Sequence, residues 1–386
     1  MRNGSYCDQG PVKYSGDSQY KSNSNLPFGE NPNIKKSLNT GSVYWRSPSN
    51  IALIKYWGKR KGQMPENPSL SITLSKSYTE TLLSFYPASE TEGKLKSYIF
   101  EGKQEESFTL RINDYLKNIQ HLYPFLSEFD LNIESRNSFP HSSGIASSAA
   151  AMSALALCLT SMERLLYGSQ SNNESFFRKA SYVARIGSGS AARSVYPGYV
   201  LWGRSKFVTD SADEYAIPVN DKIHKNFRDM RDSILIVDES PKTVSSSMGH
   251  SLMLRNPWSA IRYEQAKKHT VSIMQVLSSG DLDEFVSIVE KEALTLHSLM
   301  MNSDPGYILL KPGTLEIIEK VRQFRYETKV PVAFTLDAGP NVHLIYPGKF
   351  HDEVIVFLEE KLKPYCSNGK WIDDSAGNGP VEINTQ

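Results

Sequence analysis

The pattern of apolar and polar residues changes twice along the first half of the chain. From residue 42 the pattern is extended. Apolar and polar residues then alternate over Ser69–Tyr86, among many Thr and Tyr residues, as expected of half-buried strands. We predict a strand pair here, so that a sheet opens the first domain. Ser153–Gly168 is apolar on nearly all faces at its start, then amphipathic, and ends at a glycine, which predicts a buried helix leaving that sheet.

The second half begins with a charged patch near Arg228, followed by a short apolar strand, Asp232–Ser240. We place a domain boundary there. Three helical patterns follow, and they cover Ala260–Ser279, Leu282–Met301 and Gly313–Arg325. The strands VAFTLD and HLIYP come next. Helices and strands mixed in this order predict an α+β protein.

The expected domains are an N-terminal domain over 41–228 and a C-terminal domain over 229–386. Two domains are also what a length of 386 residues favours. Residues 1–40 are rich in Ser, Asn, Gly, Lys and Pro and show no period. We expect them to form a flexible N-terminal extension without a catalytic role.

Charge and cysteine content narrow the classes of function. Lys plus Arg (43) nearly balance Asp plus Glu (42), so no global basic field favours nucleic acid or an acidic membrane as partner. Cys7, Cys158 and Cys366 lie far apart without CxxC spacing, which argues against a disulfide framework or a zinc site and favours a reducing, cytoplasmic setting. We find no signal peptide and expect no run near the roughly 20 apolar residues of a membrane helix.

The segment Ser47–Lys59 (SPSNIALIKYWGK) places two lysines and two aromatic residues after an apolar run. A lysine beside apolar residues usually lays its stem along the core and keeps its ammonium in water. The alternative for Lys55 and Lys59 is an anionic partner. Anion-binding signals elsewhere in the chain favour that alternative.

The second signal is Asn137–Leu157, where small Ser, Gly and Ala residues lead directly into the buried helix. Free N–H groups and the positive end of the dipole bind phosphate at such a helix N-terminus. No GK[ST] follows, so this is not a Walker A loop, and backbone amides with hydroxyls such as Ser147 and Ser148 would hold the phosphates. A tight helix-packing turn is the alternative, and the bounding Pro140 and Gly144 favour the phosphate loop.

The third signal is Ala184–Gly203, which contains GSGSAA. It matches the GxGxxA dinucleotide fingerprint only superficially, because the preceding FFRKASYVARI has helical spacing whereas the fingerprint must follow a strand. We therefore exclude an NAD site. Ser188, Ser190 and Arg193 could instead bind a carboxylate or phosphate, although an arginine that only ties down a loop would give the same pattern.

Two shorter signals lie in the second half. Asp337 ends a strand beside Gly339, a place where a carboxylate can face a cleft or cap a turn. Val244–His250 (VSSSMGH) carries three adjacent hydroxyls near Lys242, a weak signal by itself.

Together these five segments resemble the mevalonate diphosphate decarboxylase family, within the superfamily of galactokinase, homoserine kinase, mevalonate kinase and phosphomevalonate kinase. The resemblance runs from about Val43 to the C-terminus. The superfamily's phosphate loop is matched by PHSSGIASSAA, and KYWGK, GSGSAAR and DAGPN match decarboxylase features. The fold implied is an N-terminal domain like the second domain of ribosomal protein S5 and a C-terminal ferredoxin-like domain, with the site in the cleft between them.

The activity implied by the resemblance uses ATP and Mg²⁺ to phosphorylate the tertiary 3-hydroxyl of mevalonate 5-diphosphate. Phosphate and carbon dioxide then leave, and isopentenyl diphosphate remains. Positioning and charge placement do most of this work. The implied partner is this small-molecule substrate, and a homodimer is an expectation from relatives. No acidic magnesium ligand can be chosen from the sequence, so ATP oxygens and serines would hold the metal.

The resemblance also implies roles for individual residues. Asp337 would orient or deprotonate the 3-hydroxyl, with Lys55 close by to hold charge. Arg193 would grip the substrate carboxylate, and Ser246 would lie near the transferred phosphoryl group. The segments that would hold the substrate and its diphosphate contribute Tyr56, Trp57, Gly58, Lys59, Lys103, Ser188, Gly189, Ser190, Ala191, Ala192 and Ser247. The loop that would cradle ATP contributes Pro140, Ser142, Ser143, Gly144, Ile145, Ala146, Ser147 and Ser148.

Several residues depart from the common pattern of the family, and they affect the expected nucleotide affinity and preference more than the expected reaction. They are His141, Ser142, Ser143, Ala151 and His250, and none removes a charge that the mechanism needs. Three alternatives stay open: a 3-kinase of mevalonate or its 5-phosphate, a decarboxylase of the 5-monophosphate, and a catalytically silent ligand-binding homologue. Asp337, Lys55 and Arg193 are all present, which argues against a 3-kinase and against a silent homologue.

Overall fold

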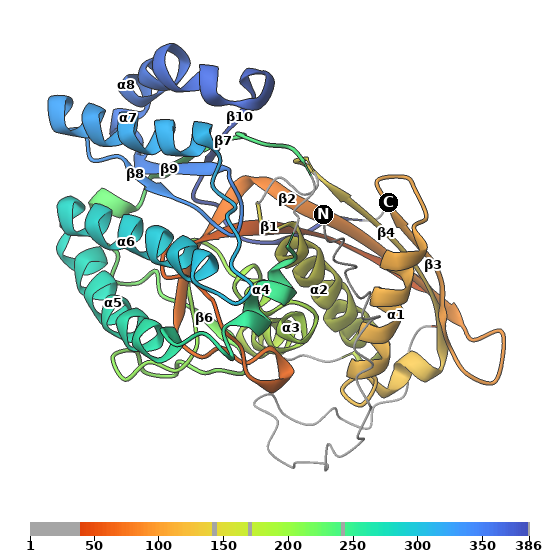
Figure 1. The fold of residues 1–386 in the computed structure, drawn as a ribbon. Helices are drawn as coiled ribbons and strands as arrows, with labels where there is room; N and C mark the ends of the chain where they lie inside the picture. The colour runs from red at the N-terminus through yellow and green to blue at the C-terminus, as the bar shows by residue number, and fades with distance from the viewer. Residues whose placement is uncertain (1–38, 141–144, 169–171, 241–243, 385–386) are drawn as a thin grey trace, which may run out of the picture.

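The computed structural model describes residues 39–140, 145–168, 172–240 and 244–384 (Figure 1). The strands are β1 (Gly41–Ala52), β2 (Ser69–Pro87), β3 (Leu95–Phe100), β4 (Phe129–Asn137), β5 (Tyr199–Trp202), β6 (Ala216–Pro218), β7 (Met230–Leu235), β8 (Ala333–Thr335), β9 (Val342–Pro347), β10 (Trp371–Ser375) and β11 (Val381–Glu382). The α-helices are α1 (Glu106–Ile119), α2 (Ser147–Tyr167), α3 (Asn173–Gly187), α4 (Ser246–Leu252), α5 (Ser259–Ser279), α6 (Leu282–Met301), α7 (Pro312–Thr328) and α8 (His351–Phe357).

The first sheet has the order β11-β1-β2-β4-β3, with β5 paired to β2 and β6 to β5. Helices α1, α2 and α3 cover one face of it, as Figure 1 shows. Helix α2 begins after Ala146, which has a left-handed backbone, and ends at Gly168, also left-handed. The predicted buried helix and its glycine stop are therefore confirmed, and the helix extends six residues further towards the N-terminus than its apolar pattern indicated.

Helix α2 also corrects one expectation from composition. Among the described residues it is the one helix whose length and apolar character would suffice to cross a membrane, although we expected no such run. Its most apolar window is 83% buried inside the protein. It therefore lies as a core helix against the first sheet.

The strand pair predicted over Ser69–Tyr86 is wrong, because this segment is one continuous strand, β2. Its first part pairs with β5 and its second part with β4, while β1 runs along both. Alternation indicates a strand but says nothing about a turn, and no glycine or proline interrupts this run.

A bulge in β2 joins the two sheets. The register between β1 and β2 shifts after Pro48, which has no N–H for the ladder. The backbone N–H groups of Ser75, Lys76 and Ser77 in the bulge donate to the carboxylate of Asp374 at 2.7–2.9 Å. Since Asp374 lies on β10, a buried carboxylate of the second sheet satisfies the unpaired amides of the first.

The second sheet has the antiparallel order β10-β7-β9-β8. Ile234 and Ile345 face α5, α6 and the first sheet, while their neighbours Leu235 and Leu344 face α7 and α8. Both faces are thus covered, which explains why every residue of β9 is buried. The three predicted helices of this half are confirmed as α5, α6 and α7.

The predicted α+β class with two domains is confirmed. A shared hydrophobic core joins the domains, because residues of β1, β2 and β5 cluster with residues of α5, α6 and β7. The last strand, β11, returns to pair with Trp45 and Arg46 of β1, so the C-terminal end of the chain contributes to the first sheet.

Candidate active site

A cavity of about 260 Å³ is lined by residues from both halves of the chain. The first half supplies the end of β1 and the segment after it, Arg111 of α1, the start of α2 and the turn after α3. The second half supplies the start of α4, Leu296 of α6 and the loop after β8. The residues that line it are Asn50, Ala52, Lys55, Tyr56, Trp57, Lys59, Gln63, Arg111, Ala146, Ser148, Gly187, Ser188, Gly189, Ser190, Arg193, Ser245, Ser246, Ser247, His250, Leu296, Asp337 and Ala338.

The charges in this lining favour an anionic ligand. Lys55, Lys59, Arg111 and Arg193 are cationic, and Asp337 is the one carboxylate among the lining residues just given. Several serine hydroxyls add neutral donors. Because the whole chain is nearly neutral, this excess of positive charge is local to the cavity.

Lys55 and Asp337 form an ion pair in the lining of the cavity. The ammonium lies 2.9 Å from Asp337 Oδ1, and the Lys55 side chain is 1% exposed against 26% for Asp337. Burial lowers the pKa of Lys55, and the nearby Asp337 charge opposes that effect. The carbonyl of Asp337 is held in turn by the Gly339 N–H and by the ring of His297. These contacts hold the backbone of Asp337 at the place from which its carboxylate reaches the ammonium.

Arg193 lies buried beside this pair, in the short helix η3 (Gly189–Arg193). Its guanidinium donates to Asn50 Oδ1 at 3.2–3.3 Å, to Ser71 Oγ at 3.0 Å and to Ser69 Oγ at 2.7 Å. These partners are uncharged oxygens. Burial lowers the pKa of Arg193 to about 10, with the Asp337 charge acting against it, so the group stays cationic at neutral pH.

A row of hydroxyls connects the two small-residue motifs. Ser148, in the first turn of α2, lies 3.3 Å from Ser188, which lies 3.5 Å from Ser190. On the other side, Ser245 caps α4 by accepting the Met248 N–H, and Ser246 and Ser247 follow it along the cavity. Hydroxyls from three separate segments therefore face one space.

His250 lies against two aromatic rings of the cavity lining. The sequence analysis noted this histidine as a departure from the family pattern and gave it no role. Its ring lies 4.4 Å from that of Tyr56 and 4.7 Å from that of Trp57. The Gly58 N–H donates to its Nδ1 at 3.0 Å, so the neutral ring carries its proton on Nε2. Burial, helped by the charge of Lys59, lowers the pKa of His250 to about 3.

Lys59 lines the same cavity as Lys55 but lies among other groups. Its ammonium donates to Gln63 Oε1 at 3.1 Å. Its pKa is lowered by burial and then by the positive charge of Arg111. The two lysines thus share one cavity, with Lys55 at the carboxylate and Lys59 near a second cation.

Most of the residues expected from the sequence meet in this cavity, and several do not line it. Lys103 is exposed in the turn after β3 and lies outside the lining. Ala191, Ala192 and Ile145 are buried in hydrophobic cores. The others that are not part of the lining are Gly58, Pro140 and Ser147, of which Ser147 lines a neighbouring pocket with Ala151. His141, Ser142, Ser143, Gly144 and Lys242 lie outside the described residues.

The sequence analysis missed Asn50, Gln63 and Arg111, and it noted Ser245 only as one of the three hydroxyls of VSSSMGH. Asn50 carried a usable signal, because it is a polar residue inside the apolar end of a strand. Arg111 carried none, since it occupies the polar side of an amphipathic helix like any solvated arginine. The exclusion of an NAD site is consistent with the fold, because GSGSAA follows α3 rather than a strand.

No group of three or more His, Cys, Asp or Glu side chains that could hold a metal ion occurs within the described ranges. The hydroxyls that line the cavity with Asp337 come mainly from serines. Hydroxyl and carboxylate oxygens are hard donors, which suit Mg²⁺ bound together with phosphate oxygens and water.

Comparisons with known proteins agree with this geometry. Residues 47–213 match the diphosphomevalonate decarboxylase-like N-terminal domain, and residues 233–384 match the mevalonate 5-diphosphate decarboxylase C-terminal domain. The diphosphomevalonate decarboxylase of Saccharomyces cerevisiae is 31% identical over 331 residues, which cover 81% of this chain and 79% of that protein.

Solved structures show the same fold. A structure of MDDEF in complex with MVAPP, AMPPCP and magnesium superposes with a TM-score of 0.74 at 28% identity, covering 90% of this chain and 100% of the other. The mevalonate diphosphate decarboxylase of Staphylococcus aureus gives a TM-score of 0.75 at 27% identity, covering 89% of this chain and 98% of the other. Both domain models match in the expected order, and the similarity extends over most of each protein, so this chain belongs to the diphosphomevalonate decarboxylase family.

Proposed function

We propose that this protein catalyses the ATP-dependent decarboxylation of mevalonate 5-diphosphate to isopentenyl diphosphate, with release of ADP, phosphate and carbon dioxide. The observation that carries the proposal is the Asp337 carboxylate paired to a buried Lys55 in a cavity otherwise lined by cations and hydroxyls. The relatives' names, and the complex of MDDEF with MVAPP, AMPPCP and magnesium, support it.

In the first step, Asp337 would receive the 3-hydroxyl of the substrate in a hydrogen bond and orient its oxygen towards the γ-phosphate of ATP. The adjacent Lys55 ammonium makes Asp337 a weaker base, so orientation contributes more than proton abstraction. Lys55 also offsets negative charge that develops during phosphoryl transfer. Ser246, at the facing start of α4, would donate to the transferred group.

In the second step, the bond from C3 to the new phosphate breaks and the phosphate leaves with the electron pair. The bond to the carboxyl carbon then breaks, its electrons form the double bond, and carbon dioxide leaves. Arg193 would hold the carboxylate until this point. A buried guanidinium whose partners are neutral oxygens gains a full counter-charge from such a ligand.

The outer groups would bind the phosphates. Lys59, Tyr56, Ser188, Ser190 and Ser247 would hold the diphosphate, with Arg111 as a further cation facing the same space. Ser148 and the free N–H groups at the start of α2 would hold ATP phosphates. Asp337 and these hydroxyls supply oxygens fit for Mg²⁺, which would neutralise phosphate charge when bound.

The test is to incubate the pure protein with ATP, Mg²⁺ and each of mevalonate, its 5-phosphate and its 5-diphosphate, measuring ADP and carbon dioxide separately. We expect equal amounts of both products with the 5-diphosphate alone. ADP without carbon dioxide would mean a 3-kinase. Turnover of the 5-phosphate would mean a monophosphate decarboxylase, and no turnover with any substrate would mean a silent homologue.

Asp337→Asn tests the role of the carboxylate, because it changes charge and not size. We expect it to abolish turnover while nucleotide binding, followed by fluorescence titration, stays close to that of the wild type. Near-normal activity in this variant would remove Asp337 from the mechanism.

Three further expectations belong to the same proposal. The division of the chain near residue 228 is supported by β7, the first strand of the second sheet. A cytoplasmic setting is supported by Cys158 and Cys366, which are buried as free thiols. A homodimer, expected from relatives, is tested by light scattering coupled to gel filtration, where a monomer mass would reject it.

A further inference from the structure

The backbone of Lys55 is held by side chains instead of by a sheet. β1 ends at Ala52, so Lys55 has no ladder partner. Its N–H donates to Glu292 Oε2 at 2.9 Å, and its carbonyl accepts from Arg262 Nη2 at 3.2 Å and Asn67 Nδ2 at 3.1 Å. A buried peptide needs such partners, and here two of the three come from α5 and α6 in the other half of the chain.

Glu292 is the centre of this arrangement. It is fully buried, and Arg262 donates to both its oxygens, at 2.8 and 2.5 Å. His269 Nδ1 lies 2.6 Å from Oε1. Burial raises the pKa of Glu292, but Arg262, His269 and the Lys55 N–H together outweigh burial and bring it to about 2. Glu292 is therefore an anion that every neighbour contacts as a donor.

We propose that Glu292, supported by Arg262 and His269, is a positioning residue for Lys55. It fixes the backbone from which the ammonium reaches Asp337 at 2.9 Å. The inference rests on the proposed function of Lys55. Arg262 and Glu292 lie on α5 and α6, in the second half of the chain, whereas Lys55 belongs to the first domain. The packing of the two domains against each other therefore determines the position of Lys55.

A buried glutamate that only stabilises the helices would pair with an arginine but would not contact Lys55. Helix α6 contains such a residue. Glu290, two residues earlier, is buried and accepts from Arg325 Nη1 at 2.7 Å and Nη2 at 3.1 Å. Its other contacts are the Phe334 N–H at 3.4 Å and Arg322 Nε at 4.0 Å. Glu290 therefore matches Glu292 in residue type, helix, burial and arginine partner, without touching Lys55.

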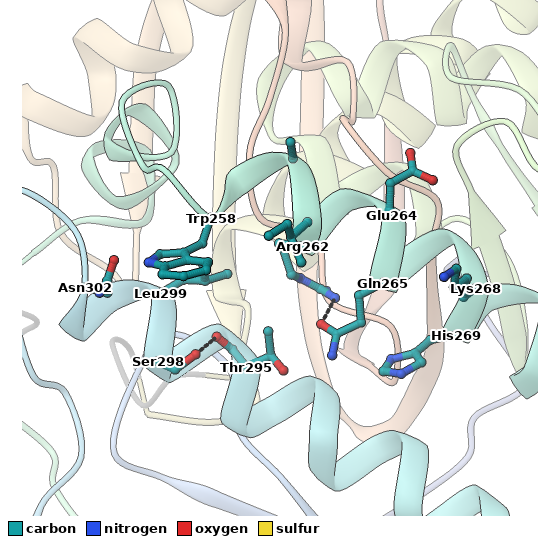
Figure 2. Close-up of a pocket in the computed structure, with 12 residues that line it drawn as sticks. Trp258, Arg262, Glu264, Gln265, Lys268, His269, Thr295, Ser298, Leu299 and Asn302 are labelled. Carbon is teal, nitrogen blue, oxygen red and sulfur yellow. Dashed lines mark hydrogen bonds between the residues drawn. The ribbon is translucent and has the colours of Figure 1, made fainter.

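A second variant avoids the buried pair. Figure 2 shows Arg262 and His269 on the same helix, α5, beside a groove of about 820 Å³ between α5 and α6. His269 is partly exposed there, at 15%. Its replacement removes one donor from Glu292 at the rim of the network, where the fold tolerates change better than at its centre.

The experiment compares Glu292→Gln, Glu290→Gln and His269→Ala with the wild-type full-length protein. Glutamine keeps the shape but has one acceptor oxygen. In either orientation its amide N–H faces Arg262, and it faces either the Lys55 N–H or His269 as well. We expect Glu292→Gln to lower kcat by about 100-fold with KM within 3-fold. Glu290→Gln should keep kcat within 3-fold at a comparable loss in urea midpoint.

Hydrogen exchange supplies a readout that does not need activity. The peptide that contains Lys55 should exchange at least tenfold faster in Glu292→Gln and at the wild-type rate in Glu290→Gln. If the wild type has no decarboxylase activity, the proposed function fails while this measurement still tests the positioning role. Equal exchange in both variants, or equal losses of kcat, would overturn the inference.

If Glu292→Gln does not fold, His269→Ala tests the inference, because alanine has no donor for Glu292. A loss in kcat of at least 5-fold with an unchanged KM supports the positioning role. A kcat equal to that of the wild type contradicts it.

Discussion

His250 should make the protein measurably less stable in mild acid, and the size of the effect follows from its surroundings. The ring is held between Tyr56 and Trp57 and accepts a hydrogen bond from the Gly58 N–H. Its pKa falls from 6.5 to about 3, first because of burial and then because of Lys59. A protonated ring would lose that hydrogen bond and face a second cation.

The sign of the pH dependence follows from proton binding. Between about pH 6.5 and pH 3 the unfolded chain binds a proton at this histidine and the folded chain does not, so stability falls as the pH falls through this window. At pH 5 the loss from this one group is about 2 kcal/mol relative to pH 7. Because pH 5 lies well above the pKa of His250 in the folded protein, the loss of about 2 kcal/mol depends almost entirely on the pKa of this histidine in the unfolded chain.

The assay is urea unfolding at pH 7 and pH 5, followed by tryptophan fluorescence. His250→Asn removes the titrating group and keeps an oxygen that can accept from Gly58, and all other groups titrate as before. We therefore expect the wild type to lose about 2 kcal/mol more than the variant between the two pH values. His250→Gln, a second non-titrating variant, should behave as His250→Asn does.

Equal losses in the wild type and both variants would refute the reasoning, because the imidazole would then titrate alike in the folded and unfolded states. Lower absolute stability of the variants does not affect this comparison. Only the difference between the two pH values is used.

Three other predictions concern separate features. Arg193→Ala should raise KM for the substrate and reduce kcat/KM by roughly 30-fold or more in steady-state assays, and unchanged kinetics would remove the carboxylate-binding role. Gly58→Ala should lower the urea midpoint, since φ is +99° and a Cβ would lie 2.1 Å from Tyr263 Oη, at a cost above about 1 kcal/mol; a wild-type midpoint would show that the loop adjusts. Burial raises the pKa of the Cys158 thiol, so mass spectrometry should find it unalkylated by iodoacetamide until the protein unfolds, and rapid native labelling would contradict its burial.

Local sequence patterns predicted the helices well, because the backbone hydrogen bonds of a helix form within the helical segment itself. The predicted Leu282–Met301 has the same bounds as α6, and GSGSAA was correctly separated from a strand by the helical spacing before it. Strand pairing is not local. The alternation over Ser69–Tyr86 gave the right conformation and the wrong number of strands, since the partners β4 and β5 lie far along the chain.

The same distinction holds within the site. Motifs identified Lys55, Arg193 and Asp337, because each lies in a short segment of unusual composition. Glu292 had no such signal. It contacts a residue 237 positions away, and on its own helix it is one charged residue among several, like Glu290.

The two lysines of the segment Ser47–Lys59 differ for a physical reason that the sequence alone does not contain. Lys55 is buried and held at its backbone from the second half of the chain, and its ammonium donates to Asp337. Lys59 is held by Gln63, four residues away, and lies near the positive charge of Arg111. A single carboxylate satisfies the first lysine, whereas the second remains beside like charge until an anion binds. Mevalonate 5-diphosphate has its carboxylate and hydroxyl at one end and its two phosphates at the other, which is the order of charges that this arrangement favours.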